Sequence, residues 1–351
     1  MSLTLPNSEK TIANGRHYEF DNIRFFATFS VIVIHVIGQL AEDFDLGTVL
    51  KQKTFLASVT IAYEAIFRSG IPLFLMLTGA LLLPKKEIGY KFIEKRFIRI
   101  LIPYIIWSLV YLLSKSAADG FNIGKIISGL IFGAHYHLWF VNVVLLIYVT
   151  MPFLKRFLTR YGVNGYYIIG LLLFITFVID ILPVSLPLKP TIIRYMSFIG
   201  YVTLGYFIAT TRLQFLNNLV IGIILTFAGS IITLFGGLGY FDLESNISVD
   251  YFSFSTFHLL LRSVGIFIIF KHLSKYIRLD IQVYISKVSK YSFGIYLIHP
   301  LVLFFMKKGF NISYKLFHPL VGIPLTAVTC MFFSVLLFVI IDRLSVGKYF
   351  Y

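Results

Sequence analysis

The stretch FDNIRFFATFSVIVIHVIGQL, residues 20–40, is mostly apolar but carries two groups that hydrocarbon tolerates poorly. They are Arg24 and, eleven residues later, His35. Eleven steps along an α-helix return to nearly the same face, about 16 Å further along the axis. The stretch therefore predicts a membrane-spanning helix with a cation near one membrane surface and an imidazole near mid-depth on the same face.

The composition extends this prediction to the whole chain. Of the 351 residues, 58% are hydrophobic and only 13% are charged, whereas soluble domains average about 25% charged residues. Most of the apolar stretches approach the ~20 residues that span a bilayer. They are residues 24–40, 62–83, 98–114, 137–153, 165–183, 195–210, 217–236, 254–271, 291–307 and 319–341. We therefore predict an all-α polytopic membrane protein with about ten transmembrane helices.

The basic residues orient these helices. Most of the 31 Lys and Arg fall in the terminal segments and in alternate loops, and cytoplasmic loops are usually the basic ones. We expect a cytoplasmic N-terminal tail at 1–20, one transmembrane domain at 21–342 and a cytoplasmic C-terminal tail at 343–351. The net charge of +15 then faces anionic membrane lipids rather than nucleic acid, for which no binding motif is present.

The pair in the first span has a chemical and a structural interpretation. A neutral imidazole at the depth of His35 can accept a proton from a hydroxyl, as a general base does. Arg24, nearer the cytoplasm, could hold a phosphate or stabilise charge in the site. The alternative is an imidazole that hydrogen-bonds to a neighbouring helix and only stabilises packing. The residues of this span leave both interpretations open.

A second basic pair begins the third span, in KFIEKRFIRILIPYIIW (residues 91–107). Arg96 and Arg99 are three residues apart and so share one helix face. Forked guanidinium groups suit phosphate, which would make this a binding site for an anionic substrate. A cytoplasmic anchor that merely obeys the charge bias of membrane proteins is the alternative.

The second span, YEAIFRSGIPLFLMLTGALLL (residues 63–83), places Glu64 four residues before Arg68. The two can pair on one helix face, and such a pair is tolerated in a membrane where it faces protein or water. It could lock the structure or support a site. Pro72 and Gly79 would bend this helix or let another backbone approach closely.

Further polar groups lie in HYHLWF and SFGIYLIHP. His135 and His137 are two residues apart, which would suit a metal pair on a strand, but no third ligand is evident and we predict no metal site. Trp139 is typical of a membrane-interface anchor. His299 comes just before Pro300, which lacks an N–H and so frees the carbonyl four residues back, at Tyr296. For His299 a structural role is at least as well supported as a catalytic one.

Other motifs are missing. The sequence has no Walker-type loop, no dinucleotide fingerprint and no broken-helix pair that recurs in matching halves, as many transporters have. Buried Arg, His and Glu would nevertheless also suit a proton-coupled transporter. An exporter of a lipid-linked oligosaccharide or another small substrate is therefore the alternative function.

Five segments in this order resemble the membrane-bound acyltransferase-3 family over nearly the whole chain. They are the Arg24-to-His35 spacing with Asp21 before it, Arg68 followed by IPLFLMLTGALLL, Arg96 and Arg99 followed by ILIPYIIW, HLWFVNVVLLIYVTMPFL, and YSFGIYLIHPLVL. The chain looks like the stand-alone form of the family, without an appended extracytoplasmic domain.

The resemblance implies a bacterial plasma-membrane O-acetyltransferase that takes an acetyl group from cytoplasmic acetyl-CoA. The acceptor would be a hydroxyl of a cell-surface or lipid-linked saccharide, and glycan-assembly enzymes are possible partners. Acetyl-CoA would be a substrate, with no permanently bound cofactor. The resemblance implies catalytic roles for His35 and Arg24 and donor binding by Arg96 and Arg99. Possible supporting residues are Arg68, Glu64, His137, Trp139 and His299.

Overall fold

The computed structural model describes residues 17–43, 55–85, 88–119, 123–132, 134–181, 189–239, 251–344 and 347–351. Within these ranges the chain is α-helical and contains no strand. The α-helices are α1 (Tyr18–Asp43), α3 (Phe55–Phe67), α4 (Gly70–Leu82), α5 (Tyr90–Asp119), α6 (Ile123–Phe132), α7 (Trp139–Tyr161), α8 (Val163–Ile181), α9 (Lys189–Thr210), α10 (Leu219–Gly237), α11 (Phe257–Leu273), α12 (Leu279–Ser289), α13 (Ser292–Gly309) and α14 (Pro319–Ile341). The prediction of an all-α polytopic membrane protein is confirmed.

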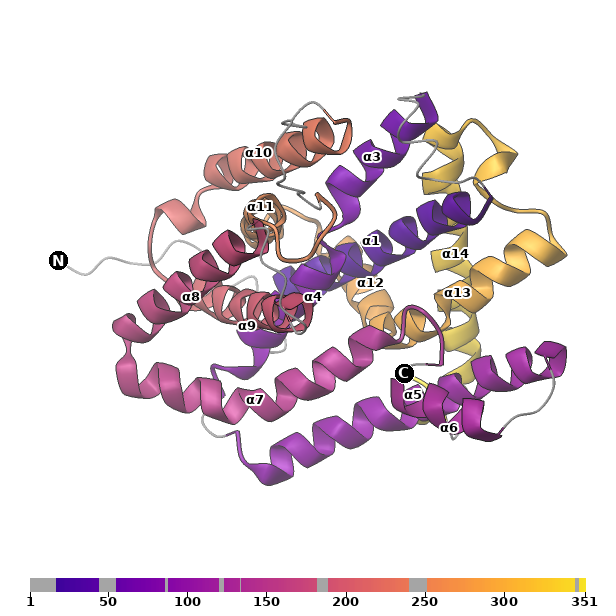
Figure 1. Ribbon diagram of the computed structural model, residues 1–351, viewed down its shortest axis with the longest axis horizontal. Helices are drawn as coiled ribbons and strands as arrows, with labels where there is room; N and C mark the ends of the chain where they lie inside the picture. Colours follow the sequence, from indigo (N-terminus) through magenta and orange to yellow (C-terminus); the bar gives the residue numbers. More distant parts are fainter. Residues whose placement is uncertain are drawn as a thin grey trace.

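Helix α1 runs through the middle of the molecule (Figure 1) and packs against α3, α4, α11, α12, α13 and α14. Its apolar side chains repeat at three- and four-residue intervals and are fully enclosed, among them Ile23, Ala27 and Val36. Burial on so many sides fixes the rotation of the helix. Consequently Arg24 and His35, both on α1, are aimed into protein rather than lipid.

Glycine lets α4 and α9 approach to backbone contact. A Cβ added at Gly79 would collide with the Val202 carbonyl, and one added at Gly205 would collide with the Met76 carbonyl. Small residues of this kind are the usual means of close helix packing in membranes, where van der Waals contact replaces the hydrophobic effect. The expectation that Gly79 admits another backbone is confirmed.

The structure does not confirm the predicted number of spans. Among the described residues, eight helical segments are long and apolar enough to cross a membrane, or nine if α12 and α13, which meet at a 67° bend, form one broken span. All ten predicted stretches correspond to helices, but α11 has only 17 residues, which is about 26 Å of helix against a core of about 30 Å. The count of ten therefore stays unconfirmed.

Residues 347–351, part of the predicted C-terminal tail, pack against the bundle. Trp107 Nε1 donates to the Phe350 carbonyl at 3.1 Å, and the Tyr351 ring lies edge-on to Tyr291 at 5.0 Å. The Tyr351 hydroxyl also donates to Asp342, which accepts from Lys290 Nζ at 2.7 Å. These contacts hold the segment beside the first turn of α13.

Candidate active site

A basic cavity of about 570 Å³ opens at the end of the bundle where α4 ends and α5 begins. Five cationic side chains line it: Arg24, Lys85, Arg96, Arg99 and Lys290. They come from distant parts of the sequence, so the fold itself gathers them. The remaining wall is largely apolar, including Leu77, Leu81 and Val144. A cavity with cations at one end and an apolar wall suits an anionic ligand that carries an apolar arm.

Arg24 is held in place on α1. Its Nη1 pairs with Asp21 Oδ1 at 2.7 Å, one helical turn earlier. Asp21 is 5% exposed and also accepts from the hydroxyl of Ser286 on α12. Because the carboxylate is fixed from two helices, the guanidinium of Arg24 is oriented at the cavity wall before any ligand arrives.

Lys290 is also oriented by a carboxylate. Asp342 accepts from Lys290 and Tyr351, and these hydrogen bonds lower the pKa of Asp342 to about 2. The same contact with Asp342 raises the pKa of Lys290. Asp342 thus partly neutralises Lys290, as Asp21 does Arg24. Lys85, Arg96 and Arg99, which pair with no carboxylate among the described residues, supply most of the remaining positive charge of this cavity.

His35 lines a second cavity of about 180 Å³, deeper along α1. The cavity is also lined by Arg68, His137, Trp139 and Tyr296. The His35 ring contacts the His299 ring at a centroid distance of 4.7 Å. Neither ring nitrogen of His35 makes a hydrogen bond with another residue in the described ranges. The imidazole is therefore available to a ligand in this cavity.

The carbonyl that Pro300 frees determines which ring nitrogen of His299 carries the proton. As the sequence predicted, the proline leaves the Tyr296 carbonyl without its helical partner. His299 Nδ1 binds that carbonyl at 2.8 Å, and because a carbonyl only accepts, Nδ1 carries the proton. His299 Nε2 is then a lone-pair acceptor, fully buried and without a partner among the described residues. This Nε2 belongs to the same His299 ring that contacts the ring of His35.

His137 has both ring nitrogens engaged. Its Nε2 binds the Leu297 carbonyl at 3.1 Å and therefore carries the proton. Its Nδ1 lies 3.1 Å from His135 Nδ1, which must then be the donor. The imidazole of His137 is thus a fixed wall of the cavity rather than a free base, and the chain offers no group of three metal ligands among the residues described.

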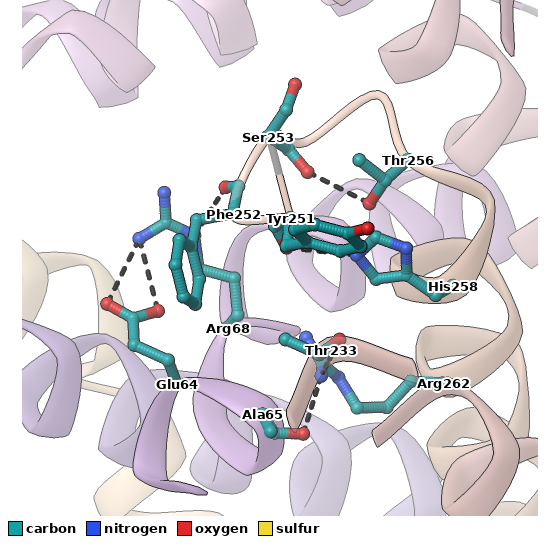
Figure 2. Close-up of polar contacts among 10 residues, drawn as sticks. All are labelled: Glu64, Ala65, Arg68, Thr233, Tyr251, Phe252, Ser253, Thr256, His258 and Arg262. Atoms are coloured by element: carbon teal, nitrogen blue, oxygen red, sulfur yellow. Dashed lines mark hydrogen bonds and ion pairs between the residues drawn. The ribbon is translucent and has the colours of Figure 1, made fainter. Parts of the chain in front are cut away.

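Arg68 and Glu64 form the predicted pair. Arg68 Nη1 lies 3.3 Å from each oxygen of Glu64, and Arg68 Nε donates to the Phe252 carbonyl at 2.9 Å (Figure 2). The guanidinium also sits 4.9 Å from the centre of the Phe254 ring. The guanidinium of Arg68 therefore lines the cavity of His35 in a fixed orientation, and the carboxylate of Glu64 neutralises its charge.

Arg262 supports this arrangement from α11. It is 1% exposed and donates to the Ala65 carbonyl at 2.5 Å and to Thr233 Oγ1 at 3.1 Å (Figure 2). Arg262 also donates to Ser69 Oγ at 3.0 Å. Ala65 and Ser69 flank the break between α3 and α4, where regular helical hydrogen bonds stop. Buried Arg262 thus stabilises the break between α3 and α4, where the half-buried Arg68 lies.

We expect Arg262→Met to destabilise the protein, because it keeps an apolar stem but leaves buried acceptors without a donor. Each such group costs about 1–3 kcal/mol, so the melting temperature in detergent should fall by roughly 5 °C or more. Arg212→Met, at an exposed arginine, is the matched control and should leave the melting temperature unchanged. Equal melting temperatures for the two variants would contradict this structural role.

The structure divides the predicted site residues between two places. Arg24, Arg96 and Arg99 line the basic cavity, whereas His35, Arg68, His137 and Trp139 line the smaller one. Trp139, predicted as an interface anchor, also stacks on Phe198 at 6.2 Å inside the bundle. Glu64 and His299 do not line this cavity, but Glu64 pairs with Arg68 and the His299 ring contacts the ring of His35. Residues that the sequence analysis did not single out for the site are Lys85, Lys290, Tyr296 and Tyr351.

A family model described as an acyltransferase domain, that of the acyltransferase-3 family, matches residues 17–343. No curated protein and no solved structure matches the chain.

Proposed function

The chain belongs to the acyltransferase-3 family of membrane acyltransferases, and from this premise we propose that it is an O-acetyltransferase. It would take an acetyl group from cytoplasmic acetyl-CoA and pass it to a hydroxyl of a cell-surface or lipid-linked saccharide in the bacterial plasma membrane. One observation carries the proposal: the cation-lined cavity and the cavity of His35 lie in succession along α1.

The donor would occupy the basic cavity. Its phosphates suit the guanidinium groups of Arg24, Arg96 and Arg99, with Lys85 and Lys290 adding charge. The apolar wall would receive the pantetheine arm, whose thioester then points toward the smaller cavity. Since the basic end also follows the charge bias of cytoplasmic loops, we propose that this end and both termini face the cytosol.

In the smaller cavity, His35 would accept the proton of the acceptor hydroxyl as its oxygen attacks the thioester carbonyl. The C–O bond forms, the C–S bond breaks, and the proton on His35 passes to the departing thiolate. The alternative order transfers the acetyl group first to His35 and then to the hydroxyl. In both, the guanidinium of Arg68 would stabilise negative charge on the carbonyl oxygen. The thioester supplies the driving force, so no ATP is consumed.

A direct assay tests the proposal. Purified protein in vesicles, given radiolabelled acetyl-CoA on the side of the basic cavity, should move label into a saccharide fraction. Release by mild alkali would identify an ester. Passage of a lipid-linked saccharide across the membrane without acetylation would instead favour the exporter.

We propose His299 as a positioning residue whose Nε2 accepts the N–H of His35 during the reaction. Asparagine places a donor where Nδ1 lies, and glutamine places an acceptor where Nε2 lies. We therefore expect His299→Asn to lower kcat by about 10–100-fold with an unchanged KM for acetyl-CoA, and His299→Gln to lower it less.

The pH profile of kcat separates this role from a structural one. Losing the acceptor should shift the profile in the asparagine variant, whereas the glutamine variant should keep the wild-type profile. Equal kcat values and equal profiles for the two variants would show that His299 only stabilises packing.

A further inference from the structure

Tyr296 stands where the two cavities meet. It lines both the basic cavity and the cavity of His35, and no other described residue lines the two. We propose that its side chain separates the cavities and sets the length of acyl group that can reach His35. This inference rests on the proposed acyltransferase function and adds a specificity-determining residue to it.

The side chain is fixed in this position. Tyr296 is 6% exposed, and its hydroxyl donates to the His137 carbonyl. Its ring packs edge-on against Phe140 at 5.9 Å and against His137 at 5.6 Å, both from the α7 side of the site. The Tyr296 ring thus extends from α13 to contact α7, and the hydrogen bond of its hydroxyl to the His137 carbonyl fixes it in that position.

The volumes on the two sides explain the expected selectivity. The basic cavity, at about 570 Å³, has room for a donor arm, whereas the cavity of His35 holds about 180 Å³. The smaller cavity must also admit the acceptor hydroxyl. A two-carbon acyl group fits past the ring, but each further methylene would need space that the ring of Tyr296 occupies.

The first test compares acyl donors of different length. We expect Tyr296→Ala and Tyr296→Leu to raise the ratio of kcat/KM for hexanoyl-CoA to that for acetyl-CoA by about tenfold or more, since one methylene in an apolar pocket already changes kcat/KM by 10-fold or more. Tyr296→Phe keeps the ring and is the matched control, with a ratio close to wild type. Leucine leaves a smaller void than alanine, so one of the two variants should stay folded.

A second test does not depend on activity. The chain has one cysteine, Cys330, so Cys330→Ser followed by His35→Cys gives a protein with a single thiol in the smaller cavity. A membrane-impermeant maleimide is added from the side of the basic cavity. Labelling should become about tenfold faster with Tyr296→Ala or Tyr296→Leu and stay at the starting rate with Tyr296→Phe.

The outcomes distinguish the two proposals. Acetyl transfer by the wild type, with chain-length ratio and labelling rate unchanged in both small-residue variants, would overturn the role of Tyr296 and leave the acyltransferase standing. Faster labelling together with no acyl transfer from any donor would support the barrier but refute the function. Faster labelling with an unchanged ratio would refute selection of acyl length.

Discussion

His35→Ala is expected to reduce acetyl transfer by about 10²–10⁴-fold, the usual contribution of a positioned general base. His35 is the titratable group of the smaller cavity whose ring nitrogens have no hydrogen-bond partner in the described ranges. The loss should appear in kcat, while the KM for acetyl-CoA, set in the other cavity, should change little. Initial rates with purified protein in detergent or vesicles measure both.

The controls separate chemistry from folding. His35→Gln keeps polarity and most of the volume but cannot accept the proton, so it should be as inactive as the alanine variant. His272→Ala changes a histidine near the end of α11, outside both cavities, and should retain full activity. A folded His35→Gln protein with near-normal kcat would exclude His35 as the base.

Arg99→Ala should raise the KM for acetyl-CoA by about 10–100-fold, since a hydrogen bond to a charged group contributes about 1.5–3 kcal/mol. Arg99 lies on α5 at the exposed mouth of the basic cavity. Saturating donor should restore most of kcat, because Arg99 lines the basic cavity and not the cavity of His35. Arg99→Lys should recover part of the affinity, as it keeps the charge but loses the fork.

Lys95 provides a matched control for charge alone. It is an exposed cation on the same helix, next to Arg96, but it does not line the cavity. Lys95→Ala should therefore leave the KM for acetyl-CoA within about twofold of wild type, allowing only for screened long-range attraction. Equal effects of Lys95→Ala and Arg99→Ala would mean that the basic end attracts the donor without a defined site.

Local sequence rules predicted a good part of this arrangement. An eleven-residue spacing, about three helical turns, puts Arg24 and His35 on one face. A four-residue spacing pairs Glu64 with Arg68, and the missing N–H of Pro300 frees a carbonyl. Each of these depends on neighbours along one helix. The chemistry of the pairs could therefore be read before the tertiary structure was known.

The rest depends on contacts between distant segments. Lys85 and Lys290 join Arg24 at one cavity only because α4, α13 and α1 meet there. Tyr296 appeared in the sequence as a freed carbonyl, whereas its side chain matters because α7 lies opposite. The span count also depends on more than local sequence rules, since α11 has only 17 residues and α12 meets α13 at a 67° bend.

The glycine contact between α4 and α9 constrains how the donor cavity can change size. With their backbones touching at Gly79 and Gly205, the two helices cannot slide or separate without losing that contact, so they behave as one rigid body. Phe74, Leu77 and Thr78 of α4 belong to that body and form a stationary wall. Any widening that admits a bulky nucleotide must therefore come from the other elements of the wall, among them α5, which carries Arg96 and Arg99.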